Sequence, residues 1–279
     1  MAGLVPAIHV FKRDARTWMP GTRPGMTKKA SPMSDKPFAN RIALVTGASR
    51  GIGYATALAL GKAGAHVIAT ARTTGGLEEL DDQIRAEGGS ATLVPLDITD
   101  TGGISRLAEA LDKRYGRLDV LVGNAAIVGD VSPLGHVQPK SWDSVLAINV
   151  TANWHLIRFL DPLLRKSDAG RAVFITSGAA SNARAYRGPY SMSKAALDVL
   201  ARTYAAETAS TNVRVNLFNP GPTRTRMRAT VMPGEDPATL PKPAQVAEAI
   251  VPLCRPDFTE TGKLYDFPSK TLKTFREPA

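Results

Sequence analysis

Cysteine is nearly absent from this chain, and so are long apolar runs. Among 279 residues there is one cysteine, Cys254, which excludes an internal disulfide bond and a metal site built from several cysteines. So little cysteine is typical of a reducing compartment, and we expect a cytoplasmic location. No apolar run reaches the ~18 residues that a membrane-spanning helix needs. We therefore expect no bound metal and no membrane partner, and we interpret Cys254 as a small apolar side chain near a helix.

Acidic residues are too few to balance the basic ones. The chain has 35 Lys and Arg against 25 Asp and Glu, a formal net charge of +10. Half of this charge lies in residues 1–32, where six basic residues accompany a single acid, Asp14. The remaining residues carry a mild basic excess and no interleaving of aromatic with basic residues, which a nucleic-acid-binding surface would show. We therefore expect no nucleic-acid partner.

Residues 1–32 lack the apolar periodicity of a folded segment and contain four prolines. A secretory signal is disfavoured because the basic residues follow the apolar stretch 4–11 instead of preceding it. An organelle transit peptide, a disordered native tail and a non-native extension remain open. We favour a non-native extension with translation starting at Met33, because the eight residues after Met33 form a short lead-in to the first predicted strand.

From residue 33 onward, predicted strands and helices alternate. Several strands are continuous apolar runs, which are typical of strands buried on both faces. This order predicts an α/β fold with a doubly wound, Rossmann-like parallel sheet, in a three-layer α/β/α single domain spanning residues 33–279. The predicted strands are 42–46, 65–70, 91–96, 118–122, 171–176, 213–218 and 263–267. The predicted helices are 51–63, 77–87, 104–115, 142–166, 189–208 and 244–253.

A glycine-rich turn, residues 46–53, follows the first predicted strand and precedes the first helix. Its glycines allow a sharp turn and let the backbone approach a pyrophosphate, and Gly53 lets the helix pack closely on the strand. The helix N-terminus would offer free amide groups to the phosphates. The turn therefore predicts a dinucleotide site. Its residues are Gly47, Ser49, Arg50, Gly51, Ile52 and Gly53.

Tyr190 and Lys194 stand four residues apart at the start of a predicted helix. This spacing places both side chains on one helix face, one turn apart. A neighbouring ammonium group favours the phenolate and lowers the pKa of a tyrosine. Ser177 ends a predicted strand thirteen residues earlier, and ligands of such folds bind where the strands end. The pattern indicates a site for proton transfer.

Together these motifs resemble the short-chain dehydrogenase/reductase family over roughly residues 41–267. The resemblance implies that four residues are catalytic, namely Asn149, Ser177, Tyr190 and Lys194, with Asn149 positioning Lys194 through a water. Residues 123–126 are similar to the family's Asn-Asn-Ala-Gly stretch, with departures at the first and last positions. The further cofactor contacts that the resemblance implies are Asp97, Ile98, Asn124, Ala125, Tyr190, Lys194, Pro220, Gly221, Thr223 and Thr225.

The end of the second predicted strand favours NADP(H) over NAD(H). An NAD site commonly places a carboxylate there to bind the ribose hydroxyl groups, whereas this chain has Ala71 followed by Arg72. Arg50 stands nearby in the glycine turn. Two guanidinium groups suit a 2′-phosphate, which a carboxylate would repel. We therefore expect NADP(H) as the preferred cofactor.

The predicted function is hydride transfer between NADP(H) and a small-molecule carbonyl or secondary alcohol. The resemblance implies that Ser177 binds the substrate oxygen, that Tyr190 transfers the proton and that Lys194 holds the nicotinamide ribose. The alternative is a catalytically weak, dinucleotide-binding regulatory or scaffold protein of the same fold, which a missing Tyr or Lys would favour. A dehydratase or epimerase is a second rival.

Residues 223–243 form a long stretch without periodicity, which we interpret as a substrate lid. Its arginines at 224, 226 and 228 leave two interpretations open, an anionic substrate or a solvated charged loop.

Helices 142–166 and 189–208 carry apolar residues beyond the single stripe that packing on a sheet requires. Such a surplus predicts a self-complementary interface, and the resembled family forms its dimers through these helices. We therefore expect a homodimer or a homotetramer. The apolar residues in question are Trp154, Leu156, Phe159, Leu160, Leu197, Val199, Leu200 and Tyr204.

Overall fold

The strands lie in one mixed sheet within residues 36–275, the part of the chain that the computed structural model describes. The predicted extension, residues 1–32, lies outside the described residues. The strand order is β3-β2-β1-β4-β5-β6-β7-β8, with β8 alone antiparallel to its neighbour. Because the order reverses between β1 and β4, a ligand crevice is expected at the carboxyl ends of these two strands. The strands are β1 (Ile42–Thr46), β2 (His66–Ala71), β3 (Ser90–Pro95), β4 (Val120–Gly123), β5 (Arg171–Ile175), β6 (Arg214–Asn219), β7 (Lys263–Asp266) and β8 (Thr271–Thr274).

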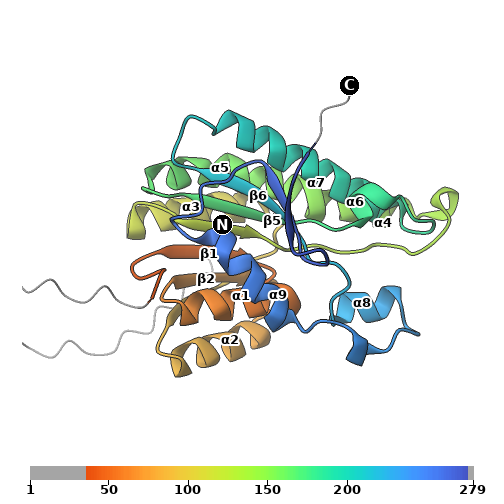
Figure 1. The fold of residues 1–279 in the computed structure, drawn as a ribbon, viewed down its shortest axis with the longest axis horizontal. Coiled ribbons are helices and arrows are strands. Elements are labelled where there is room, and N and C mark those ends of the chain that lie inside the picture. Colours follow the sequence, from red (N-terminus) through yellow and green to blue (C-terminus); the bar gives the residue numbers. More distant parts are fainter. Residues whose placement is uncertain (1–35, 276–279) are drawn as a thin grey trace, which may run out of the picture. The chain divides into compact units, whose positions relative to one another are not determined.

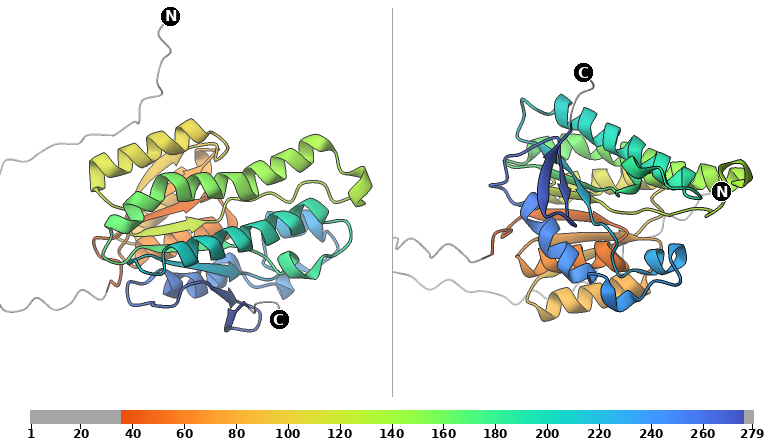
Figure 2. Two further views of the ribbon diagram at one scale, coloured as in Figure 1. Left: turned by 90° about the horizontal axis from the view of Figure 1, so that it is seen from above. Right: turned by 45° about the vertical axis from the view of Figure 1, so that its right-hand side comes forward.

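Helices cover both faces of this sheet (Figures 1 and 2). One layer consists of α1 (Gly51–Lys62), α2 (Gly75–Ala86) and α9 (Pro243–Ile250); the other consists of α3 (Thr101–Tyr115), α5 (Ala152–Lys166) and α7 (Gly188–Glu207). Each layer buries its own apolar cluster against the sheet. Strands β1 and β4 are buried along their whole length, which accounts for their uninterrupted apolar sequences. The predicted doubly wound α/β fold is confirmed.

The long helix predicted over residues 142–166 is interrupted. Helix α4 (Pro139–Leu146) and α5 are joined by η2 (Ala147–Thr151), one turn of π-helix. A π-turn adds one residue to the helix and redirects the side chains near it. Here it faces Asn149 inward, where the side chain is fully buried.

The segment predicted as an irregular lid contains short helices. They are α8 (Arg226–Val231) and η3 (Pro237–Thr239), and both are too short for apolar periodicity to be visible. The amide of Arg224 donates to the carbonyl of Pro241 at 2.9 Å, which holds the two ends of the segment together. The predicted helix 244–253 corresponds to α9 followed by the 3₁₀ turn η4 (Val251–Cys254). The other elements that the sequence did not predict are η1 (Leu134–His136), α6 (Ala179–Asn182) and the exposed strand β8.

The apolar surplus on α5 and α7 is smaller than the sequence suggested. Four of its eight residues, Leu156, Leu160, Leu197 and Tyr204, are buried in the chain's own core. Trp154 and Val199 do face outward, with 44% and 58% of their surface exposed. None of the described helices combines the length and the hydropathy that crossing a membrane requires.

Candidate functional site

The glycine turn between β1 and α1 has the backbone conformation that its sequence predicts. Gly47 and Gly51 have φ angles of +65° and +62°, which glycine adopts without strain. A Cβ atom at Gly53 would lie 2.4 Å from the carbonyl oxygen of Gly47. Only glycine therefore lets α1 start this close to the turn.

The N-terminus of α1 fits a phosphate-bearing cofactor. Arg50 is the N-cap residue, and no side chain in the described residues caps the helix there. Free amide groups at a helix N-terminus attract phosphate oxygens. Ser49 and Ile52 are half-buried in the same turn. Helix α2 packs against this turn, because a Cβ atom at Gly76 would lie 2.4 Å from the Ser49 carbonyl oxygen. This backbone is therefore suited to hold a pyrophosphate.

Arg72 directly follows β2, and its side chain is exposed. Because β1 and β2 pair in parallel, their carboxyl ends bring Arg72 and Arg50 to one edge of the sheet. Asp97, two residues beyond β3, accepts hydrogen bonds from the amide and the hydroxyl of Thr99, at 2.9 and 2.7 Å. These bonds and, to a smaller extent, the charge of Arg72 lower the pKa of Asp97. The next residue, Ile98, is buried in the core.

The segment after β4 braces the glycine turn. The Asn124 side-chain nitrogen donates to the carbonyl of Thr46 at 2.8 Å, and the amides of Asn124 and Ala125 donate to the Thr46 hydroxyl at 2.9 and 3.0 Å. At Gly123 a Cβ atom would lie 2.5 Å from the ring of Phe174. This contact explains why glycine stands where the resembled family has asparagine.

Asn219 joins the carboxyl ends of three strands. Its side-chain oxygen accepts from the amides of Gly178 and Gly221 at 2.9 and 3.1 Å, and its nitrogen donates to Asp266 at 2.6 Å. Gly221 has a φ of +62°, and a Cβ atom there would lie 2.4 Å from Pro268. These contacts therefore fix the turn after β6, which the sequence predicts to contact the cofactor.

The same turn reaches toward the glycine turn. Pro220 and Thr223 are buried, and the Thr223 hydroxyl donates to the carbonyl of Pro220 at 3.3 Å. Thr225 caps α8 by accepting from the amide of Arg228 at 3.2 Å. Its methyl carbon would lie 3.6 Å from a Cβ atom at Gly51, so the predicted cofactor contacts after β6 are adjacent to those of the glycine turn.

Ser177, Tyr190 and Lys194 come together at the carboxyl end of β5. The Lys194 ammonium donates to the carbonyl of Ile175, the last residue of β5, at 2.7 Å, and lies 5.8 Å from the centre of the Tyr190 ring. Burial lowers the pKa of Lys194 to about 8. Burial also raises the pKa of Tyr190, and the Ser177 hydroxyl and the charge of Arg187 oppose this rise. The direction differs from the lowering that the spacing to Lys194 suggested.

Asn149 contacts the helix that carries Tyr190 and Lys194 but hydrogen-bonds to neither side chain directly. Its side chain exchanges two hydrogen bonds of 2.9 Å with the backbone of Ile127, and its nitrogen also donates to the Ser193 hydroxyl at 2.9 Å. Ser193 directly precedes Lys194. Within residues 36–275 the contact between Asn149 and Lys194 therefore passes through Ser193.

Comparison with known proteins decides the family. Residues 41–236 match the family model for short chain dehydrogenases. The chain belongs to the short-chain dehydrogenase family. The uncharacterized oxidoreductase YciK of Escherichia coli K12 is 37% identical over 231 residues, which cover 81% of this chain and 91% of YciK. The mouse dehydrogenase/reductase SDR family member 4 is 35% identical, and the match covers 70% of each chain.

Solved structures of this family agree. A short chain dehydrogenase from Shigella flexneri, complexed with NADP, superposes with a TM-score of 0.81 at 36% identity and covers 84% of this chain and 100% of its own. One from Escherichia coli CFT073, complexed with NADPH, has a TM-score of 0.80 at 36% identity and covers 84% and 99%. The family that the motifs predicted is confirmed.

This short-chain dehydrogenase also carries an acid that the sequence analysis missed. Asp198 lies one turn beyond Lys194 on the same face of α7 and accepts a hydrogen bond from the hydroxyl of Thr176, the residue before Ser177. Burial raises the pKa of Asp198 to about 6, while the Thr176 hydroxyl and the charge of Lys194 oppose the rise. The only sequence feature that could have indicated Asp198 is its position four residues after Lys194, which places both on one helix face.

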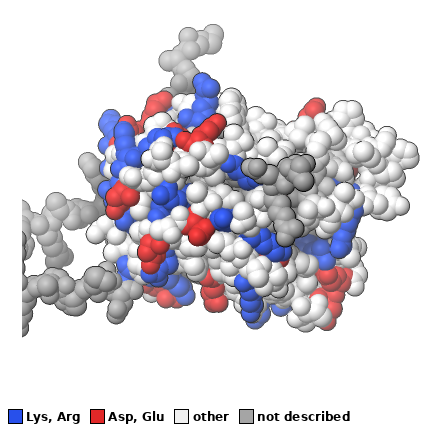
Figure 3. All heavy atoms as spheres, turned by 45° about the horizontal axis from the view of Figure 1, so that its top comes forward, with Lys and Arg blue, Asp and Glu red and all other residues white. Residues whose placement is uncertain are grey.

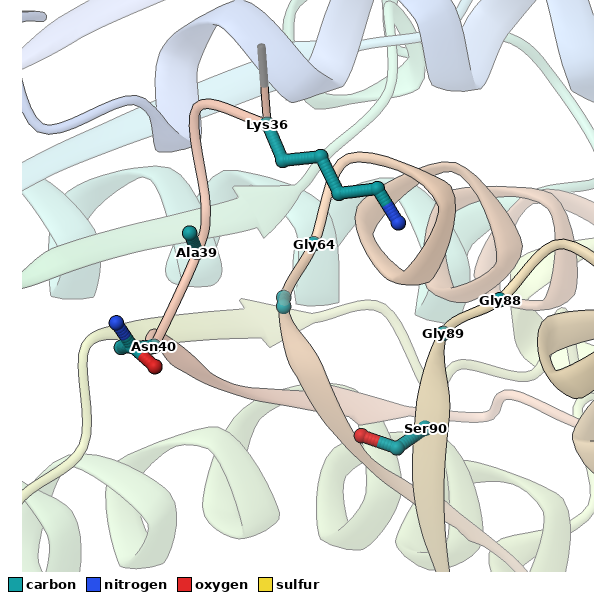
Figure 4. A pocket seen from close by; sticks show the side chains of 8 residues that line it. Lys36, Ala39, Asn40, Gly64, Gly88, Gly89 and Ser90 are labelled. Carbon is teal, nitrogen blue, oxygen red and sulfur yellow. The ribbon is translucent and has the colours of Figure 1, made fainter. Parts of the chain in front are cut away.

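A shallow depression at the opposite edge of the sheet carries no such chemistry. It lies at the amino ends of β2 and β3 (Figure 4). Apart from Lys36 it is lined by small or neutral residues, Ala39, Asn40, Gly64, Ala65, Gly88, Gly89 and Ser90.

Proposed function

We propose that this short-chain dehydrogenase transfers a hydride between NADP(H) and a carbonyl or secondary alcohol, with Tyr190 as the general acid and base. The observation that carries the proposal is the grouping of Ser177, Tyr190 and Lys194 at the carboxyl end of β5. The glycine turn lies after β1, at the same edge of the sheet. A dinucleotide held there would bring its reactive end toward these side chains.

Each residue then has a distinct task, written here for reduction. The cofactor supplies the hydride. The Ser177 hydroxyl donates to the substrate oxygen and stabilises the charge that develops on it. Tyr190 donates its phenolic proton to that oxygen, and the Lys194 ammonium stabilises the phenolate that remains. Asn149 holds α7 in place through Ser193.

Turnover of a carbonyl panel tests this proposal. Purified protein is mixed with NADPH and a set of aldehydes and ketones, and NADPH consumption is compared with alcohol formed. We expect one alcohol formed for each NADPH oxidised. NADPH binding without turnover of any member would instead favour the regulatory or scaffold alternative.

We further propose that NADP(H) is preferred over NAD(H). The support is the pair Arg50 and Arg72 at the ends of β1 and β2, with Ala71 in place of an acid. Two similar short-chain dehydrogenases were solved with NADP and NADPH. A charge-assisted hydrogen bond contributes about 1.5–3 kcal/mol, so the preference should exceed about tenfold.

Titration of both cofactors measures this preference. We expect the Kd for NADPH to be at least about tenfold lower than that for NADH. Arg72→Ala should weaken NADPH binding and leave NADH binding nearly unchanged. Arg255→Ala serves as the matched control, since Arg255 is also exposed and pairs with Asp257 on the surface. Equal affinities of the unaltered protein for the two cofactors would contradict the proposal.

We also retain residues 223–243 as a proposed substrate lid. The bond between Arg224 and Pro241 closes the base of this segment, and α8 lies beyond the carboxyl ends of the strands (Figure 1). A loop with its ends held together can move as a unit.

A further inference from the structure

Arg187 lies between the proposed catalytic tyrosine and the lid. It is the N-cap residue of α7, three residues before Tyr190. Its guanidinium group contacts the sulfur of Met232, which directly follows α8, at 3.2 Å. On the other side of the helix start, a Cβ atom at Gly188 would lie 2.5 Å from Leu134 of η1. The start of α7 therefore lies between η1 and the segment after α8, and the Arg187 side chain contacts the latter.

The partner of this guanidinium group is a poor one. A thioether sulfur accepts hydrogen bonds only weakly, and no carboxylate of residues 36–275 forms an ion pair with Arg187. The side chain is half-buried. A cation that has lost part of its hydration without gaining an anion is energetically unfavourable. An anionic group bound beside Arg187 would therefore be stabilised.

The charges around Arg187 also favour the binding of an anion. Burial lowers the pKa of Arg187, the charges of Arg228 and Arg184 lower it further, and Tyr190 and the charge of Glu235 oppose this fall. The nearby acid, Glu235, is already held by Arg228 in two hydrogen bonds of 2.5 and 2.6 Å. Arg228 and Glu235 therefore neutralise each other. The positive charge of Arg187 remains available close to Tyr190.

We propose that Arg187 binds a carboxylate of the substrate, so that the natural substrates are carbonyl acids or hydroxy acids. The planar guanidinium fork suits a carboxylate and would orient the reacting carbon toward Ser177 and Tyr190. This inference rests on the proposed function. It is separate from the cofactor phosphate, because Arg50 and Arg72 lie at the ends of β1 and β2.

A matched pair of substrates tests the role of Arg187. The NADPH-loaded protein is assayed with 4-carboxybenzaldehyde and with its methyl ester, which differ only in the charged group. We expect kcat/KM to be at least about tenfold higher for the acid. Arg187→Gln should remove this difference by lowering kcat/KM for the acid far more than for the ester, and Arg187→Lys should keep part of it. Arg255→Gln, a remote surface change, should leave both values unaltered.

Equal kcat/KM for acid and ester in the unaltered protein would overturn the inference, as would an equal loss for both in Arg187→Gln. A binding measurement separates this result from failure of the proposed function. The melting temperature of the protein with NADP⁺ is followed as terephthalate or its diamide is added. A rise with terephthalate alone, lost in Arg187→Gln, supports the carboxylate site even without turnover. No difference between the two additives, or a rise that Arg187→Gln keeps, counts against it.

Discussion

Lys194, which is buried, and Asp198, which is half-buried, are ionisable side chains one helical turn apart. Burial alone would leave both uncharged, which is why the pKa of Lys194 falls to about 8 and that of Asp198 rises to about 6. Between these values the ammonium and the carboxylate coexist and stabilise each other. The proposed chemistry needs the charged form of Lys194. We therefore expect the site to be in its active protonation state between about pH 6 and about pH 8.

This coupling predicts how NADPH binding depends on pH. A lysine with a lowered pKa loses its proton as the pH rises through about 8, instead of near its ordinary value. The affinity for NADPH should therefore fall above about pH 8. Asp198→Asn removes the negative charge that favours the ammonium, so the fall should begin at a lower pH. Fluorescence titration of NADPH from acid to alkaline pH measures both curves.

The exposed acid Asp112, which pairs with Lys166 on the surface, provides the control. Asp112→Asn should leave the pH dependence unchanged. An unaltered curve in Asp198→Asn would show that the carboxylate does not support Lys194.

The spacing of residues in the sequence predicted Tyr190 and Lys194 as site residues but did not predict Asp198. Tyr190 and Lys194 were recognisable because a four-residue interval at a helix start, with a serine at a strand end, fits a known pattern. Asp198 has the same spacing from Lys194, but an acid in a helix usually faces water. Here it is half-buried and accepts a hydrogen bond from Thr176, which follows β5; no local pattern in the sequence contains this contact.

At the scale of elements, the strands and the long helices could be predicted because each buries a regular apolar face. The break at η2 could not. The sequence around Asn149 continues a helical pattern. In the structure the π-turn is accompanied by three hydrogen bonds that join the Asn149 side chain to Ile127 and Ser193. Those partners come from other segments of the chain, so the break is a tertiary effect. The same holds for β8, which is exposed and has no apolar pattern.

The glycine turn offers a test at this scale. In Gly53→Ala the new Cβ atom would lie 2.4 Å from both the Gly47 carbonyl oxygen and the Asn124 side-chain nitrogen. The turn and the start of α1 must then separate, which misplaces the amide groups proposed for the pyrophosphate. We expect the affinity for NADPH to fall at least about tenfold, since one charge-assisted hydrogen bond accounts for that much.

Calorimetric titration of NADPH checks the expected loss. Gly135→Ala is the matched control, because no atom lies within 4 Å of the Cβ atom that this change adds. If Gly53→Ala binds NADPH as tightly as the control, the turn does not hold the pyrophosphate.

For the whole molecule, the outer face of α5 and α7 bears on assembly. In Figure 3 charged side chains gather on the left and along the bottom of the view, and the upper right is largely uncharged. Trp154 on α5 and Val199 on α7 are exposed to 44% and 58%, and Arg158 lies over the Trp154 ring at 5.7 Å. We propose a self-complementary dimer through these two helices.

A charge on this face should separate the subunits. Val199→Asp should shift the mass in light scattering from that of a dimer or tetramer toward that of one chain, because an unpaired carboxylate resists burial. Activity should fall as well, since α7 carries Tyr190 and Lys194. Ala86→Asp, at an exposed position of α2 in the opposite helix layer, is the control and should keep the native mass. A single-chain mass for the unaltered protein would refute the proposed interface.

Replacement of Tyr190 by phenylalanine tests the central claim most directly. The ring and its packing remain, and only the hydroxyl that exchanges the proton is lost. With a carbonyl substrate found in the panel, kcat should fall at least about a hundredfold, within the usual contribution of a general acid. The Kd for NADPH should stay within about twofold of the unaltered value, and Lys194→Met should damage both kcat and Kd. A Tyr190→Phe protein that keeps most of its turnover would contradict the account.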